Sequence, residues 1–130
     1  MRTISKDELF DILKKHKMWI NGEVGGVRAD LYGTDLRMAD LCEADLREAN
    51  LYRADLCEAD LRGANLYRAN LYRANFYRAD LSGADLREAD LREADLRLAD
   101  LYDANLRGAN PHETNLRGTN PYEAEIRRAK

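Results

Sequence analysis

This sequence contains little that points to a membrane, to secretion or to a strongly charged partner. No apolar stretch is long enough to span a bilayer, and the N-terminus is charged from Arg2 to Lys17 without the apolar core of a signal peptide. The 21 basic and 24 acidic residues leave a net charge of only −3, so no overall field demands nucleic acid or a membrane surface. We therefore expect a cytoplasmic protein with no membrane partner.

Residues that carry enzyme chemistry are equally scarce. The two histidines, His16 and His112, are far apart in the sequence, and we expect both to be ordinary surface residues. We find no Ser/His/Asp or Cys/His arrangement, zinc spacing, phosphate loop or dinucleotide fingerprint, and no glycine-rich nonapeptide of calcium-binding β-helices. We predict that the protein is not an enzyme and has no catalytic residue, metal, cofactor or small-molecule substrate.

What the sequence does contain is one five-residue phrase, Ala-(Asp/Asn)-Leu-x-x, repeated without a gap from Ala29 to Ala129. Twenty repeats are centred on residues 31, 36, 41 and so on to 126. The centre is Leu in sixteen of them, the position two before it is Ala in seventeen, and the position between is Asp or Asn in nineteen. The repeat therefore determines the architecture of most of the chain.

A period of five fits neither an α-helix nor a flat strand. On a helix, at about 100° per residue, successive leucines would scatter around the cylinder; on a strand, an odd period would send alternate leucines to opposite faces. All leucines share one inner surface only if the chain turns a corner once per repeat, which gives coils stacked at about 4.8 Å. The spacing alone does not distinguish three sides from four.

Each position of the repeat then has a physical role. The Leu fills the axis, and the Ala lies where a corner leaves room for one methyl group. The Asp or Asn points outward, where its short side chain can bond the backbone of the turn. The last two positions face solvent and vary freely.

The run ADLREANLYRADLCEADLRGANL resembles the pentapeptide repeat family. The resemblance covers about 100 residues and implies an all-β solenoid: a right-handed, quadrilateral (four-sided) parallel β-helix, here of about five coils with an N-terminal capping α-helix. With four sides, Cys42 and Cys57 lie on different faces of adjacent coils, so we expect reduced thiols rather than a disulfide.

We expect one domain in two parts, residues 1–28 as a capping helix with its lead-in and residues 29–130 as the β-helix. Ser5 and Glu8 form a capping-box pattern that predicts a helix from about Ser5 to Lys17, with Met18, Trp19 and Ile20 packed over the first coil. We interpret this helix as a lid over the open end of the axis, with a partner-binding helix as the alternative.

Towards the C-terminus the repeat degrades, because Pro111 and Pro121 replace the central Leu. Proline removes a backbone donor, so we interpret these positions as a blunted edge. Self-association through that end is the alternative, and we expect a monomer or a weak dimer through the C-terminal end.

The outward positions form columns of residues 20 apart, such as Tyr32, Tyr52, Tyr72, Arg92 and His112, in which Tyr and Arg can stack. One band differs from the rest, because between Asp60 and Asp80 there is no acidic residue while Arg and Tyr accumulate. This band is our candidate partner surface: Arg62, Tyr67, Arg68, Tyr72, Arg73, Tyr77 and Arg78. Its four arginines predict a positive girdle for an acidic partner or a single strand, with drift of the repeat as the alternative.

Function is less specific than fold. We predict a structural or interaction module, a rigid rod that presents Tyr/Arg ladders to an unknown protein partner. The alternative comes from the resemblance, since the family's quinolone-resistance members mimic DNA and bind DNA gyrase or topoisomerase. A rod of roughly 24 Å would need on the order of 14 negative charges to match a duplex, whereas residues 29–130 carry 20 acidic and 15 basic residues, a net charge of −5. Binding of nucleic acid itself is not expected.

Overall fold

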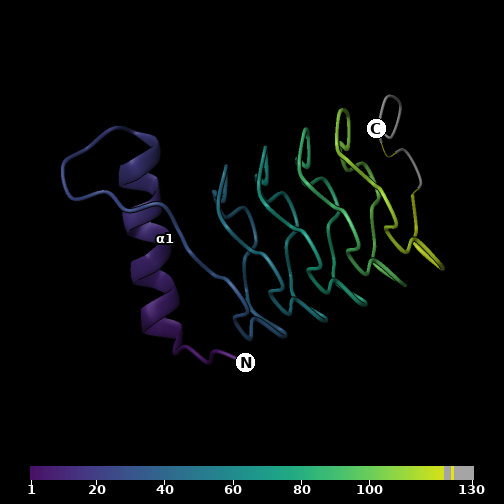
Figure 1. Cartoon of the computed structure of the whole chain (residues 1–130), viewed down its shortest axis with the longest axis horizontal. Coiled ribbons are helices and arrows are strands. Elements are labelled where there is room, and N and C mark those ends of the chain that lie inside the picture. The colour runs from purple at the N-terminus through teal and green to yellow at the C-terminus, as the bar shows by residue number, and fades with distance from the viewer. Residues whose placement is uncertain (122–123, 125–130) are drawn as a thin grey trace.

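A computed structural model of the chain describes residues 1–121 and Ala124. Within these residues the only helix is α1 (Lys6–Ile20). Figure 1 shows α1 lying across one end of a stack of coils, with the chain advancing away from it coil by coil.

The coils have four sides. Parallel backbone bridges join residues that are 20 positions apart, beginning with Asp30 and Asn50 and continuing to Asp100 and Asn120. Because one repeat occupies five residues, a coil contains four repeats; a three-sided coil would instead pair residues 15 apart. This register decides between the two geometries that the spacing had left open.

Each side of a coil is too short to form a continuous strand. The contacts between coils in residues 1–121 are isolated bridges at the Asp/Asn position. The Leu46 N–H donates to the carbonyl oxygen of Asn65 in the next coil at 2.8 Å, and the Asn65 N–H donates back to the Ala44 oxygen at 2.9 Å. The N–H of the corner residue Glu48 adds a third bond, to the Tyr67 oxygen at 2.9 Å, so a few backbone bonds per side join each coil to the next.

The corners are β-turns with the fifth residue of the repeat in the left-handed region. At the turn after Leu46, the Ala49 N–H donates to the Leu46 oxygen at 3.0 Å, and Glu48 has φ of 62°. Positive φ at the third residue is the feature of a type II turn, which normally favours glycine. Most corners here hold Glu, Arg, Met, Leu or Asp instead.

The Asp/Asn position stabilises these turns. In every repeat from Asp30 to Asn115, its Oδ1 accepts a hydrogen bond from the backbone N–H two residues later. Asp and Asn share this acceptor, so they are interchangeable in the turn and differ only in outer charge. The predicted role of this position is confirmed.

The interior is a column of leucines bordered by alanines. Residues such as Leu56 and Leu86 are fully buried, and Phe76 replaces Leu without becoming exposed. At the central position the N–H donates to the following coil, so Pro111 and Pro121 remove two such donors.

Helix α1 begins as predicted and ends later than predicted. The Ser5 side chain accepts from the Glu8 N–H, and the Glu8 side chain accepts from the Ser5 N–H, so the capping box is confirmed. The helix continues beyond Lys17 to Ile20, because no residue before Asn21-Gly22 breaks it. The apolar residues of the N-terminal segment that pack against the core are Ile4, Leu9, Ile12 and Leu13 rather than Met18, Trp19 and Ile20.

The prediction that His16 is a surface residue is wrong. His16 is fully buried between α1 and the first coil, with its ring stacked on Trp19 at 5.6 Å. Its Nδ1 accepts from the Ala29 N–H at 2.9 Å, so the proton lies on Nε2, which donates to the Arg47 oxygen at 2.8 Å. A single histidine in a sequence carries no signal of such a role.

Further contacts fix the N-terminal segment to the first coil. The Lys17 ammonium lies 3.0 Å from the Asp45 carboxylate. Arg2 forms a parallel bridge with Thr34, which adds a short edge to one side. Gly26 approaches the backbone of Trp19 so closely that a Cβ atom would overlap it, which explains a glycine there. Cys42 and Cys57 are free thiols, as expected.

Candidate functional site

The predicted partner surface forms a belt around the middle of the stack, which we call the Tyr/Arg belt: Arg62, Tyr67, Arg68, Tyr72, Arg73, Tyr77 and Arg78. Its tyrosines occupy the fourth position of their repeats, and Arg68, Arg73 and Arg78 occupy corners with φ of 57° to 58°. The corner geometry points each guanidinium along the side of the stack, where it can reach both the adjacent ring and the next coil.

The tyrosine rings of the belt lie against cationic groups. The Tyr67 ring centroid is 5.3 Å from the Arg68 guanidinium carbon and 5.1 Å from that of Arg87 in the next coil. Tyr77 contacts Arg78 and Arg97 in the same way, at 5.4 and 5.2 Å. The predicted Tyr/Arg stacking is therefore confirmed.

Tyr72 belongs to a longer stack. Its ring centroid is 5.2 Å from Tyr52, which is 5.3 Å from Tyr32, and the Arg92 guanidinium lies 4.9 Å from it on the side of the next coil. Base stacking on an aromatic platform requires an open ring face. In this column, Tyr52 and Tyr72 have neighbours stacked on them, so the geometry does not favour single-stranded nucleic acid.

The positive charge predicted for the belt is largely neutralised, which corrects the sequence interpretation. Arg68 Nε lies 2.9 Å from Glu88 Oε1, and Arg73 Nε lies 2.9 Å from Glu93 Oε1. The two glutamates lie 20 residues later, so a linear scan of residues 61–79 misses them. The register of 20 is the signal that would have found them.

The other two arginines of the belt differ from each other. Arg62 forms a bidentate pair with Asp60, at 2.8 and 2.6 Å, which lowers the pKa of that carboxyl. Arg78 has no ion pair among residues 1–121, because Leu98 occupies the corner one coil later. Of the four arginines, Arg78 keeps its charge without a carboxylate partner.

The coil after the belt repeats one ion pair on three sides. Arg87, Arg92 and Arg97 each donate two hydrogen bonds to the aspartate two residues before them. Hydrogen bonding to Arg92 and Arg97 lowers the pKa of Asp90 and Asp95. These arginines are thus held rigidly while their guanidinium planes cover the belt tyrosines.

Metal-binding side chains do not cluster in the part of the chain that the structure describes. Within residues 1–121 and 124, no group of three or more His, Cys, Asp or Glu side chains is arranged to hold a metal ion. His112 is exposed, as predicted, and lies 4.0 Å from Glu113. In the same part of the chain, no helix has the length and apolar character needed to cross a membrane.

Comparison with known proteins identifies the type of repeat. The family model described as pentapeptide repeats matches residues 27–63, 49–87 and 94–130, with eight copies. A comparison with curated proteins found no match.

Among solved structures, a pentapeptide repeat protein from the Arabidopsis thaliana thylakoid lumen is 35% identical, with a TM-score of 0.55. The match covers 73% of this chain and 63% of the Arabidopsis protein. A pentapeptide repeat protein from Nostoc PCC 7120 is 34% identical over 85% of this chain and 71% of its own, with a TM-score of 0.41. QnrB1, a plasmid-mediated fluoroquinolone resistance protein, is 25% identical over 77% of this chain and 56% of its own, also with a TM-score of 0.41.

The structural similarities to the Nostoc protein and to QnrB1, each with a TM-score of 0.41, are too low to indicate a function. The similarity to the Arabidopsis structure, together with the family model, implies the right-handed quadrilateral β-helix. The chain belongs to the pentapeptide repeat family.

Proposed function

We propose that this protein is a non-enzymatic structural or interaction module, a rigid rod that presents ordered Tyr and Arg side chains to a protein partner. The observation that supports this function is the order of the outward side chains in the middle coils. Tyr72, for example, is held by Tyr52 on one side and Arg92 on the other. A surface ordered before binding loses little conformational entropy when a partner docks.

The Tyr/Arg belt is the proposed partner surface. Its tyrosines supply apolar area with fixed orientation, and Arg78 supplies a cation without a carboxylate partner among the described residues. Tyrosine and arginine are also the residues that most often dominate protein interfaces. A partner of acidic character fits this composition, while a purely stabilising role for the ladders is the competing proposal.

The remaining parts of the proposal concern the ends and the setting of the rod. Helix α1 acts as a lid on a β-helix of about five coils, and the protein is a monomer or a weak dimer through the C-terminal end. The lid is supported by the packing of Leu9, Ile12 and Leu13 against the core. A cytoplasmic location is proposed for this chain, although the Arabidopsis relative is a protein of the thylakoid lumen.

The test of the module is a quantitative capture experiment with three versions of the full chain. We expect Arg68→Glu, Arg73→Glu and Arg78→Glu together to lose a partner that the parent retains. The control reverses the same number of charges away from the belt, at Arg37, Arg107 and Arg117. Equal capture by the belt variant and the parent would show that the belt is not the partner surface.

DNA mimicry remains the alternative function, and the distribution of charge argues against it. Within residues 29–121, one side carries six acidic residues and one arginine (Asp40, Glu43, Asp60, Asp80, Asp100, Asp103 and Arg62), a net charge of −5. The other three sides carry net charges of −1, 0 and 0 over the same coils. A duplex is negative all around at about one charge per 1.7 Å. We therefore expect no effect on gyrase supercoiling at stoichiometric protein, and inhibition below micromolar concentration would favour mimicry.

A further inference from the structure

The corner arginines follow a pairing rule. In the two columns where a corner Arg is followed one coil later by Glu, the side chains form an ion pair with the same geometry: Arg68 with Glu88, and Arg73 with Glu93, each at 2.9 Å from Nε to Oε1. The guanidinium therefore reaches towards the coil that follows, and a carboxylate at that corner receives it.

Arg53 breaks this rule. The residue one coil later in its column is Arg73, so a cation stands where the rule requires a carboxylate. Among residues 1–121, Arg53 has no ion pair; its guanidinium carbon lies 5.4 Å from the Tyr52 ring centroid. Two arginines thus stand at successive corners of one column, and the glutamate that follows them, Glu93, pairs with Arg73 alone.

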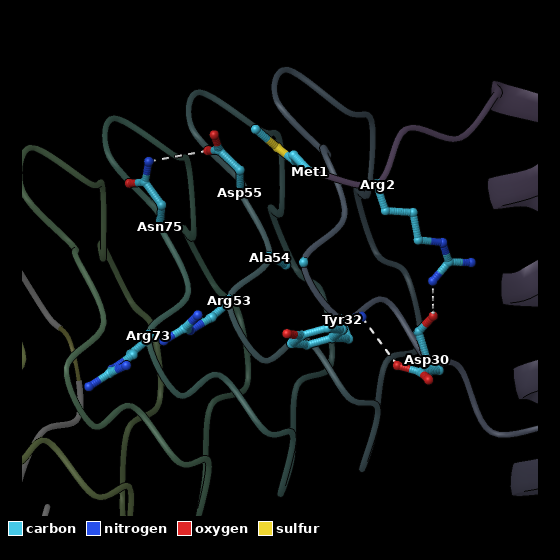
Figure 2. Close-up of a pocket in the computed structure, with 10 residues that line it drawn as sticks. Met1, Arg2, Asp30, Tyr32, Arg53, Ala54, Asp55, Arg73 and Asn75 are labelled. Carbon is cyan, nitrogen blue, oxygen red and sulfur yellow. Dashed lines mark hydrogen bonds between the residues drawn. The ribbon is translucent and has the colours of Figure 1, made fainter.

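A groove opens beside these two arginines, and we call it the Arg53 groove. It has a volume of about 620 Å³ and is lined by Arg2, Tyr32, Gly33, Arg53 and Arg73 among others. Figure 2 shows Arg53 and Arg73 projecting from neighbouring coils along one edge, with the N-terminal residues across from them and Tyr32 between. At Gly33 an added Cβ would meet nothing within 4 Å, so the missing side chain leaves the groove open at this corner.

The aspartates of the groove are engaged in the scaffold. Asp30 Oδ1 accepts from the Tyr32 N–H and from Asn50 Nδ2, and Asp55 Oδ1 accepts from the Cys57 N–H and from Asn75 Nδ2. Arg2 donates to the backbone oxygen of Asp30 at 2.7 Å, not to its carboxylate. Three arginines against two aspartates leave the lining with a net charge of +1.

We propose that the Arg53 groove binds an acidic segment of a partner protein, with one carboxylate of that segment held between the guanidinium groups of Arg53 and Arg73. The inference deepens the proposed function, because it names the chemistry of a partner and a site for it outside most of the belt. Arg73 uses Nε for Glu93, and its terminal nitrogens remain for a second acceptor.

The chemistry of the groove favours a carboxylate on a peptide over a phosphate backbone. The chain itself satisfies Arg68 and Arg73 with glutamate carboxylates at these corners. Tyr32 lines the groove, is held by its stacking on Tyr52 at 5.3 Å, and is 49% exposed, so it offers apolar contact to a neighbouring peptide side chain. Asp30 and Asp55 would repel a chain that carries a charge at every residue.

The experiment is a fluorescence-polarisation titration of the full chain with a labelled hexapeptide of alternating Glu and Ala, and with the same peptide carrying Gln in place of Glu. We expect the Glu peptide to bind, with affinity that falls as salt increases, and the Gln peptide to bind at least tenfold more weakly. Arg53→Gln and Arg73→Gln should each weaken the Glu peptide about tenfold. Arg53→Lys, which keeps the charge but loses the planar fork, should give a smaller loss.

The matched control is Arg97→Gln, which removes another ordered arginine that does not itself line the groove. It should leave peptide affinity unchanged, and thermal melts of all variants verify that they are folded. Equal binding of the Glu and Gln peptides, or full affinity in Arg53→Gln, would overturn the proposal. Tighter binding of inorganic phosphate or of a short single-stranded oligonucleotide at the same arginines would also overturn it in favour of a phosphate site.

Failure of the groove proposal can be distinguished from failure of the proposed function. Arg53 is absent from the set of belt variants, and the peptide titration requires no natural partner. If the belt variant loses its partner while the parent does not bind the Glu peptide, the proposed function stands and the groove is not a binding site for an acidic segment.

Discussion

The repeat body and the N-terminal helix are stabilised in different ways. In the body, the same contacts recur every five residues: the bridge at the Asp/Asn position, the turn at the corner and the buried leucine. The helix is held by contacts that each occur once, including the hydrogen bonds of His16 and the ion pair of Lys17 with Asp45. A periodic body gains stability from the sum of equivalent neighbours, whereas a cap depends on a few individual residues.

The largest expected effect comes from a charge placed in the periodic interior. Leu86 is fully buried and Arg87, the next residue, points outward, so the pair separates the two environments within one repeat. Leu86→Asp should prevent folding, because an unpaired charge would be buried where adjacent coils cannot relax. Arg87→Ala should cost no more than about 1 kcal/mol in the free energy of unfolding. Thermal melts of equal midpoint for the two variants would contradict the assignment of inward and outward positions.

Removal of α1 should act on the end of the stack of coils rather than on its body. Deletion of residues 1–20 exposes apolar axis residues such as Leu31 and Leu36, together with unpaired backbone groups of the first coil. We expect aggregation or end-to-end association in sedimentation velocity, with circular dichroism that retains the β-helix. A truncated chain that stays monomeric and melts like the parent would show that α1 is not a lid.

A milder way to weaken the contact between α1 and the first coil is to protonate His16. Burial lowers the pKa of His16 below its usual value, and a proton on Nδ1 would face the Ala29 N–H. The folded state therefore binds this proton less readily than the unfolded state, whose pKa is about 6.5. The contribution of His16 to stability is complete above that pH and is lost as the pH falls from there towards the lowered pKa of the folded state.

The charges around His16 are known from the structure. Arg28 and Arg47 oppose its protonation, whereas Asp45, paired with Lys17, favours it. We expect the protection factors of α1 amides, which are corrected for the slower intrinsic exchange at lower pH, to fall between neutral pH and pH 5 in the parent, and His16→Gln to remove this dependence. Protection factors that do not change with pH in the parent would contradict the role of His16.

The smallest expected effect tests the corners of the body. Met38 has φ of 61° and is 74% exposed, so its substitution changes the backbone preference without removing core packing. Met38→Val should destabilise by roughly 1–2 kcal/mol, because β-branched residues disfavour this region. Met38→Gly should change stability little, because relief of strain offsets the entropy of glycine. Equal denaturation midpoints for Val and Gly would contradict a left-handed corner at this position.

The difference between the periodic body and the N-terminal helix also explains which features could be predicted from the sequence. The repeat predicted the inward leucines, the turn-bonding Asp/Asn and the stacking of Tyr with Arg, because each follows from the period of five and the chemistry of one position. The partnership of Arg68 with Glu88 was missed because the charge of the band was counted along residues 61–79, whereas Glu88 lies one coil later in the same column. The burial of His16 was missed for a different reason. It depends on one tertiary contact, with the Ala29 N–H, which belongs to no repeated pattern in the sequence.

Because the register is 20 residues and the repeat is five, the alignment of outward residues can change without a change in the interior of the rod. Deletion of the five-residue repeat 54–58 would leave Leu on the axis and Asp or Asn in the turns, so the body would still close. Every residue after the deletion would, however, move back by one side, a quarter turn around the axis relative to the residues before it. Arg53 would then no longer share a column with Arg73, and the tyrosine stack would end at Tyr52. Because a coil has four sides, insertion or deletion of whole repeats can give four relative orientations of the two parts of the rod. Each orientation aligns different outward residues for recognition, while the leucine core stays the same.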